Sequence, residues 1–382
     1  MFNFDIIYLG LNLILLVSFI VCGKRMSNGE KFTLNALLCI VVYSIVLGLR
    51  YNRGYDYFHY INHYLYGYTE GKQYVYVLLL NVMKVLGIGK HYIFVIYSLI
   101  EMLCAFLFLK RYKKYGTYIV PFFLLSTIVF NEYAIRQALG FSFAFLCIDS
   151  FFDILGQKQL LNKESIVRLV KIVVLFAISY SIHSVCGFVL IIIFLIAIFL
   201  RNTVPIIVSV PSLIFSVFFF QQWIDYSWFE KIISLFSSDE RLSHYVNEYD
   251  QWFTNDASND RFTRNSIVMV FELLGSISLF YFANKTIQEK YTYKKDFICL
   301  YNVFVIGVIF LNCFRNIELF QRIAQNIYLF YFFAISLVLY HRTEIIKSSR
   351  EKILGVFLVW WVYDYVKYLF FRGEMTQFIW DI

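Results

Sequence analysis

Apolar stretches of the length that crosses a lipid bilayer recur along almost the whole chain. A membrane-spanning helix needs about 20 predominantly apolar residues, within a range of roughly 17 to 25. Stretches near that length occupy residues 6–22, 32–49, 91–109, 117–133, 134–152, 169–183, 185–200, 203–220, 266–283, 297–313, 320–341 and 352–371. Lipid offers the backbone no hydrogen-bond partners, so such segments must be helices or strands of a closed barrel. At this length they predict an all-α, polytopic integral membrane helical bundle with about twelve transmembrane helices.

The composition agrees with a membrane protein. Hydrophobic residues make up 60% of the chain and charged residues only 16%, whereas soluble domains carry about 25% charged residues. Three prolines and no flexible or single-sign charged tract leave no sign of a linker. We therefore expect residues 1–382 to form a single transmembrane domain. The shorter apolar segment 74–88 is interpreted as an interfacial or re-entrant helix, because a crossing there would place the basic segment 110–114 outside.

The basic residues distinguish two sides of the membrane, since Lys and Arg favour cytoplasmic loops. With these spans, 20 of the 34 basic residues fall on the inner side. Both termini then lie outside, together with the longer external segments 50–73 and 221–265. Inner loops that face anionic lipid explain the net charge of +8, and no basic soluble surface for nucleic acid is evident.

The outer side favours arginine over lysine. Nine of the 14 outer basic residues are arginines, against six of the 20 inner ones. A planar guanidinium binds phosphate or carboxylate through two parallel hydrogen bonds, which lysine cannot do. Arg136 and Arg322 lie at or inside apolar spans, where a central charge costs about 2.5–3.5 kcal/mol. Charges at such positions usually face a hydrated cavity and mark a functional path.

A polar, tyrosine-rich segment follows the second apolar span. Residues 47–68 combine Arg50, Arg53, Asp56 and His59 with seven tyrosines. Most of the chain is suited to lipid, so cations, a carboxylate and aromatic rings gathered at one membrane surface need a specific reason. We interpret this segment as the first candidate for an active site.

Four short motifs, in chain order, point to a known family. They are RYNRGYDYFHY (50–60), IRQALGFS (135–142), SIHSV (181–185) and RIAQNIYLFYF (322–332). Together they resemble the EpsG family, Wzy-like polymerases of bacterial exopolysaccharide, capsule and O-antigen assembly. Gly140, where a small alanine is commoner, and the additional Arg53 are the departures from the family pattern.

The resemblance implies a fold like that of the GT-C-like polysaccharide polymerases, in the bacterial cytoplasmic (inner) membrane. It also implies a glycosyltransferase that joins oligosaccharide repeat units carried on polyprenyl (undecaprenyl) pyrophosphate at the outer face. The implied partners are the lipid-linked oligosaccharide, membrane lipid and other polysaccharide-assembly proteins.

The residues suit that chemistry independently. A sugar pyrophosphate carries its own leaving group, so the protein must stabilise negative charge, position an acceptor hydroxyl and remove its proton. No Asp-x-Asp pair for a divalent ion occurs in the outer loops. We therefore expect an inverting, metal-independent polymerase in which arginines replace the metal and no cofactor is needed.

Candidate roles follow for eleven residues. Asp56 and His183 are the catalytic candidates, Arg50, Arg53, Arg136, Arg315 and Arg322 are the pyrophosphate-binding candidates, and Gln137, Tyr57, Tyr60 and Glu318 are the substrate-binding candidates.

Simpler interpretations of these residues stay open. Asp56 would also serve as a structural ion-pair partner of Arg50 or Arg53, and His183 as a neutral packing residue. If helical, the interval from Arg315 to Arg322 would place its three charges on one face, as a phosphate site or a salt-bridge network.

The external segment 221–265 is rich in tryptophan, tyrosine and phenylalanine. Such residues form an aromatic belt at membrane surfaces, and they also stack on sugar rings in a lid. Both interpretations remain open.

Two other functions compete with polymerisation. A ligase would transfer a finished glycan to another acceptor, and a transporter or flippase would move the lipid-linked glycan across the membrane. Transport needs polar groups along the whole path, but the inner halves of the spans are apolar apart from Glu101, Asp149 and Glu272. Chemistry at the outer face is therefore favoured.

Overall fold

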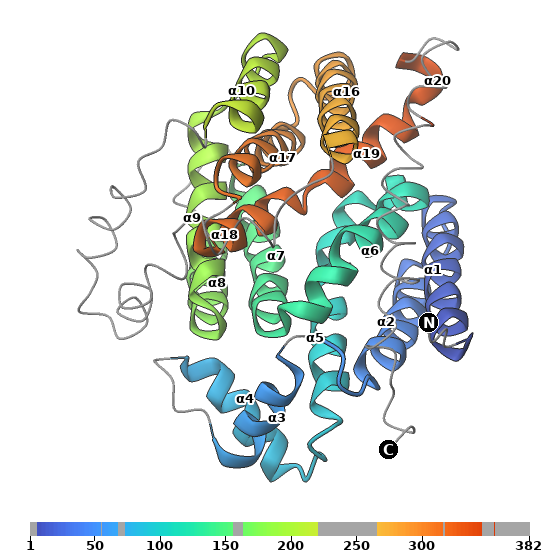
Figure 1. Cartoon of the computed structure of the whole chain (residues 1–382), viewed down its shortest axis with the longest axis vertical. Helices are drawn as coiled ribbons and strands as arrows, with labels where there is room; N and C mark the ends of the chain where they lie inside the picture. Colours follow the sequence, from blue (N-terminus) through green and yellow to red (C-terminus); the bar gives the residue numbers. More distant parts are fainter. Residues whose placement is uncertain are drawn as a thin grey trace, which may run out of the picture.

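The computed structural model describes residues 6–54, 56–67, 73–155, 163–220, 266–315, 318–345 and 355. These residues form helices and no strand, as the sequence predicts (Figure 1). The aromatic segment 221–265 and nearly all of the expected last span, 352–371, lie outside the described residues.

The helices occur in the following order. They are α1 (Ile6–Ser27), α2 (Phe32–Gly48), α3 (Tyr57–Tyr66), α4 (Tyr74–Val85), α5 (Ile93–Leu109), the 3-10 helix η1 (Lys110–Tyr115), α6 (Gly116–Tyr133), α7 (Ile135–Leu155), α8 (Lys163–Ile182), α9 (Ser184–Phe199), α10 (Ile206–Phe218), α16 (Ser266–Lys290), α17 (Lys295–Cys313), α18 (Glu318–Tyr328), α19 (Tyr331–Tyr340) and α20 (Arg342–Ile345).

Within the described residues, six helical stretches are long and apolar enough to cross a membrane. They are Ile7–Ser27, Ile93–Tyr133, Ile135–Leu155, Lys163–Ile182, Lys295–Cys313 and Phe320–Tyr340. The stretch Ile93–Tyr133 divides into α5 and α6 at a kink in η1, where Tyr112 leaves helical geometry (φ −107°, ψ 19°). Four more apolar helices, α2, α4, α9 and α10, are shorter. The structure is therefore that of a multi-pass membrane protein, but the expected count of about twelve crossings is not confirmed.

The 12 residues of α4 extend only about 18 Å, well short of a hydrocarbon core about 30 Å thick. This length agrees with an interfacial or re-entrant helix.

Apolar side chains cover the outside of the bundle as well as its core. On α8, Val167, Val170 and Val173 are each more than half exposed. Water would penalise an apolar surface of this kind, whereas lipid tails accept it. The helix thus presents its outer face to the bilayer.

Segments that the sequence assigns to the inner side meet at one end of the bundle. The contacts that join them are Ser27 with Thr117, Tyr115 with Tyr291, Lys295 with the Leu155 carbonyl, and Arg342 with Tyr118. We call this the basic end. Helices α3 and α4 lie at the opposite, lower end in Figure 1, whereas α20 of the basic end lies at the top.

Candidate functional site

A buried ion pair fixes the turn between α2 and α3. Arg53 Nη1 lies 3.4 Å from Glu132 Oε1, and the two side chains are 0% and 4% exposed. Arg53 Nη2 also donates to the Val46 carbonyl oxygen at 2.8 Å, and its guanidinium lies 5.1 Å from the Tyr8 ring centroid. The carboxylate that pairs with Arg53 is therefore Glu132 of α6, which sequence reasoning did not assign as a partner.

Arg50 is buried beside this pair and has hydrogen-bond donors that its described neighbours leave unused. Its guanidinium lies 5.1 Å from the ring centroid of Phe94. Its Nε and Nη1 have no hydrogen-bond partner within the described parts of the chain. Buried donors of this kind are costly unless a water or ligand satisfies them. Arg50 is thus better placed than Arg53 to accept an anionic or polar ligand.

Gly54 brings this turn directly against α6. Its φ is +94°, and a Cβ built there would stand 2.2 Å from the Glu132 carbonyl oxygen. Only glycine tolerates both the left-handed backbone and this approach. A tight turn is therefore present at Gly54, and Asp56 follows it as the residue that precedes α3.

Helix α3 directs two tyrosines into the protein. The Tyr57 ring stacks on Phe94 at 4.5 Å, and its hydroxyl hydrogen-bonds His91 Nδ1 at 3.0 Å. The Tyr60 hydroxyl accepts a hydrogen bond from the Arg136 backbone N–H at 3.2 Å. Tyr57 therefore supports the wall of the site, and Tyr60 connects α3 to the start of α7.

Charged groups converge on Tyr60. Burial raises the pKa of its hydroxyl, while the charges of Arg136, Asp56 and Arg322 also act on it. Arg136 is the second residue of α7 and is half-buried, with its guanidinium 5.7 Å from the Tyr76 ring centroid. The structure thus brings three of the predicted site residues around a fourth.

Gln137 joins two of the sequence motifs. Its Nε2 donates to the Arg322 carbonyl oxygen at 3.1 Å, and Asn326 donates to the same oxygen at 2.7 Å. Arg322 lies in α18 and is half-buried. This hydrogen bond joins positions 137 and 322, which are 185 residues apart in the chain, so Arg136 and Arg322 belong to segments that contact each other.

The sequence left open a single helix from Arg315 to Arg322, but this interval is not one helix. Helix α17 ends at Cys313 and α18 begins at Glu318, so Arg315 precedes the helix that carries Arg322. Arg315 therefore does not share a helical face with Arg322. The side chain of Glu318 lies outside the described residues.

His183 separates α8 from α9, because its backbone is extended (φ −153°, ψ 116°). It packs beside Gly140 of α7, where a Cβ would lie 3.3 Å from His183 Cβ and 3.0 Å from Cys186 Sγ. Ser179 Oγ donates to the Gly140 carbonyl oxygen at 2.8 Å. Gly140 thus leaves room for the α8–α9 break, and His183 lies about one helical turn beyond Gln137 along α7.

Sequence reasoning gave no role to a histidine pair in α3. His59 and His63 have ring centroids 4.0 Å apart, and His63 Nδ1 lies 3.4 Å from the Tyr76 hydroxyl. The sequence does contain a signal for this pair, because histidines four residues apart lie on the same face of a helix.

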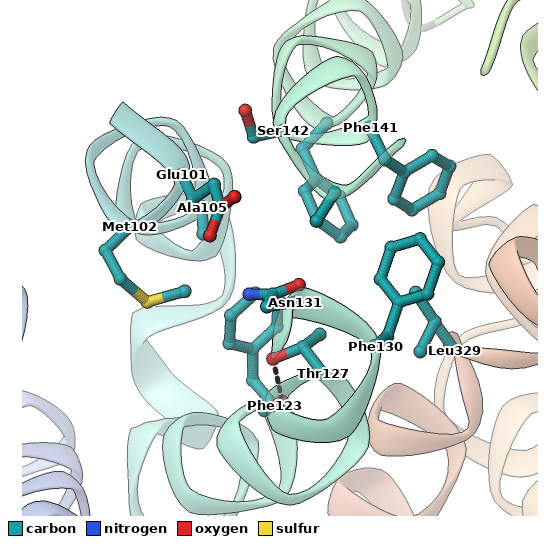
Figure 2. Close-up of a pocket in the computed structure, with 12 residues that line it drawn as sticks. Glu101, Met102, Ala105, Phe123, Thr127, Phe130, Asn131, Phe141, Ser142 and Leu329 are labelled. Atoms are coloured by element: carbon teal, nitrogen blue, oxygen red, sulfur yellow. Dashed lines mark hydrogen bonds between the residues drawn. The ribbon is translucent and has the colours of Figure 1, made fainter. Parts of the chain in front are cut away.

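A small cavity lies deeper in the bundle, among α5, α6, α7 and Leu329. Its volume is about 10 Å³, which is room for about one water molecule. Figure 2 shows the carboxyl of Glu101, the amide of Asn131 and the hydroxyl of Ser142 around it. Glu101 is 3% exposed, and its Oε1 has no hydrogen-bond partner in the described structure. The cavity suits a bound water and is too small for a sugar.

The described residues contain no group of three or more His, Cys, Asp or Glu side chains that could hold a metal ion. The cationic groups of this region include Arg50, Arg136 and Arg322, with Lys84 over the Tyr64 ring, so the arrangement suits an anionic ligand.

A family description matches residues 34–380, which include all four motifs. The chain belongs to the EpsG family. No curated protein and no solved structure matches it. Membership in the EpsG family therefore confirms the resemblance seen in the motifs, and the roles of individual residues rest on their geometry.

Proposed function

We propose that this EpsG-family protein is a polysaccharide polymerase that joins polyprenyl-pyrophosphate-linked oligosaccharide units at the outer face of the bacterial cytoplasmic membrane. The observation that carries the proposal is the junction of α3, α7 and α18, away from the basic end. There the Arg136 backbone N–H donates to the Tyr60 hydroxyl, Gln137 donates to the Arg322 carbonyl oxygen, and the charges of both arginines act on Tyr60. Two guanidinium groups near one point suit a ligand with two or more negative charges.

The proposed reaction is an inverting displacement. The acceptor oxygen forms a bond to the anomeric carbon of the donor sugar, while the bond from that carbon to the pyrophosphate oxygen breaks. Its electron pair leaves with the pyrophosphate, and Arg136 and Arg322 stabilise the growing charge. Arg50, with its unsatisfied buried donors, is assigned to the same anion.

The remaining predicted residues take supporting roles. Asp56, half-buried before α3, orients the acceptor hydroxyl, and His183 is a candidate for hydrogen bonding or proton removal beside α7. Gln137 holds the α18 backbone at Arg322. Arg53 keeps the turn in place through Glu132. Arg315 and Glu318 are assigned to the approach of the substrate. The Tyr60 side chain forms the floor of the site.

Transport of the lipid-linked glycan is the alternative from a different class. It would require a path as wide as a sugar chain, whereas the cavity beside Glu101 accepts about one water. This observation favours chemistry at one face, and the experiment below includes the transport outcome.

Purified protein in proteoliposomes, supplied with lipid-linked repeat units, separates the three functions. A polymerase produces a ladder of lengthening glycans and releases polyprenyl pyrophosphate. A ligase transfers one glycan to a different acceptor and gives no ladder, and a flippase changes only the side on which the intact substrate is found. Either of the latter two outcomes would overturn the proposal.

A further inference from the structure

The histidine pair of α3 lies at the edge of the proposed site. His63 is 6% exposed, whereas His59, one helical turn earlier, is exposed to solvent. Their rings are in contact at a centroid distance of 4.0 Å. One imidazole is thus inside the site and the next is outside it.

Groups from three helices surround His63. On its own helix it faces His59 and the Tyr60 ring, whose centroid is 6.1 Å away. From α4 the Tyr76 hydroxyl approaches its Nδ1 at 3.4 Å, and from α7 the charge of Arg136 acts on it. The Arg136 guanidinium lies against Tyr76 as well, so His63 and Arg136 share a neighbour.

These surroundings keep the imidazole neutral. Burial, the neighbouring His59 and the Arg136 charge lower the pKa of His63 to about 4. At neutral pH the ring is therefore an uncharged imidazole, and holding an additional proton beside Arg136 is unfavourable. An anion bound to Arg136 would offset that positive charge and favour the imidazolium form.

We propose that His63 accepts the proton of the acceptor hydroxyl and that His59 passes it to solvent. The proposal rests on the polymerase function above and supplies its base. In the step, the proton moves to a ring nitrogen of His63 as the acceptor oxygen bonds to the anomeric carbon, and the bonding electron pair departs with the pyrophosphate. His63 then gives the proton to His59, which releases it to water.

This arrangement makes proton removal depend on the donor. Without a pyrophosphate, Arg136 opposes protonation of His63, and a bound pyrophosphate offsets that positive charge. The base therefore becomes effective only when a leaving group is present.

The coupling is measurable without any glycan. The chain contains six histidines, and ¹⁵N-histidine NMR of the full-length protein in detergent resolves their titration, with His63→Gln identifying the His63 signal. Added inorganic pyrophosphate should raise the midpoint of His63 by about one pH unit or more. In Arg136→Gln the midpoint should start higher and respond less. A His63 midpoint that pyrophosphate leaves unchanged would overturn the proposal.

Kinetics then test the proton transfer itself. In the polymerisation assay His63→Gln should reduce the rate by about 10² to 10⁴-fold. His59→Gln should reduce it less, and imidazole buffer should restore part of that loss. His341→Gln, at the basic end, is the matched control and should retain the wild-type rate.

Failures of the two proposals are distinguishable. If wild-type protein makes a ladder and His63→Gln makes it equally fast, the polymerase stands and the base is another group, with His183 the next to test. If wild-type protein makes no ladder, the polymerase assignment fails, and the pyrophosphate titration still decides whether an anion at Arg136 controls His63.

Discussion

At the scale of single residues, the site depends on positions where only one residue type fits. Gly54 combines a left-handed backbone with a carbonyl oxygen 2.2 Å from where its Cβ would be. Gly29 has a similar φ of +87°, but no atom lies within 4 Å of its Cβ position. Substitutions at these two glycines therefore distinguish the free-energy cost of the left-handed backbone from the cost of the close approach to α6.

Gly54→Ala should destabilise the protein more than Gly29→Ala. The left-handed conformation costs about 1–2 kcal/mol for a residue with a Cβ, and both variants incur it. Only Gly54→Ala must also move the Glu132 backbone, which displaces the start of α7 and Arg136. Thermal unfolding in detergent measures the difference, and equal melting temperatures for the two variants would show that the approach of Gly54 to α6 is unimportant.

His63 should make stability depend on pH. Its pKa of about 4 in the folded protein lies below the value of about 6.5 for an unperturbed histidine. The unfolded chain therefore binds a proton more readily, and stability is lost as pH falls from about 6.5 toward 4. His63→Gln should flatten the dependence of melting temperature on pH in that window. An unaltered dependence would mean that other groups produce it.

At the scale of elements, sequence reasoning succeeded where a pattern determined the structure. The apolar stretches predict helices at nearly all the described positions, and the basic segments do meet at one end. The partner of Arg53 was not predictable, because Glu132 is 79 positions away and only the packing of α6 against the turn brings it near. The break between α18 and α19 was also missed, since the apolar pattern of 320–341 continues through it.

The buried Arg53–Glu132 pair should hold these elements together. Removing one partner of a buried pair costs about 3–5 kcal/mol, because it leaves the other charge unpaired. Arg53→Met and Glu132→Gln should each lower the melting temperature strongly, and the double variant should lose less than the sum. The exposed pair Arg25–Glu30, at 3.9 Å with both side chains 54% exposed, is the control and should show almost no coupling. Comparable coupling in the two cycles would contradict a structural role for the buried pair.

At the scale of the whole molecule, the candidate site and the basic end lie at opposite ends of an apolar bundle. The basic end is held by contacts among loops, such as Tyr115 with Tyr291. The other end gathers Arg50, Arg136 and the histidines of α3. Membrane orientation then determines on which side the reaction takes place.

Labelling of single cysteines tests that orientation. Phe58→Cys lies on an exposed face of α3, and Lys113→Cys lies on the exposed side of η1. In intact cells an impermeant maleimide should label the first and should reach the second only after permeabilisation. Equal labelling of both sites from outside would contradict the assigned sides.

The central claim is that Arg136 binds the pyrophosphate of a lipid-linked donor. The polymerisation rate of Arg136→Lys tests this claim most directly. Lysine keeps the charge but loses the planar pair of donors, so the rate should fall roughly tenfold or more. Arg136→Gln, which also removes the charge, should lose about 2–4 kcal/mol of transition-state stabilisation, a decrease of roughly thirtyfold to a thousandfold. Arg342→Lys at the basic end should polymerise at the wild-type rate. Wild-type rates for both Arg136 variants would contradict the account.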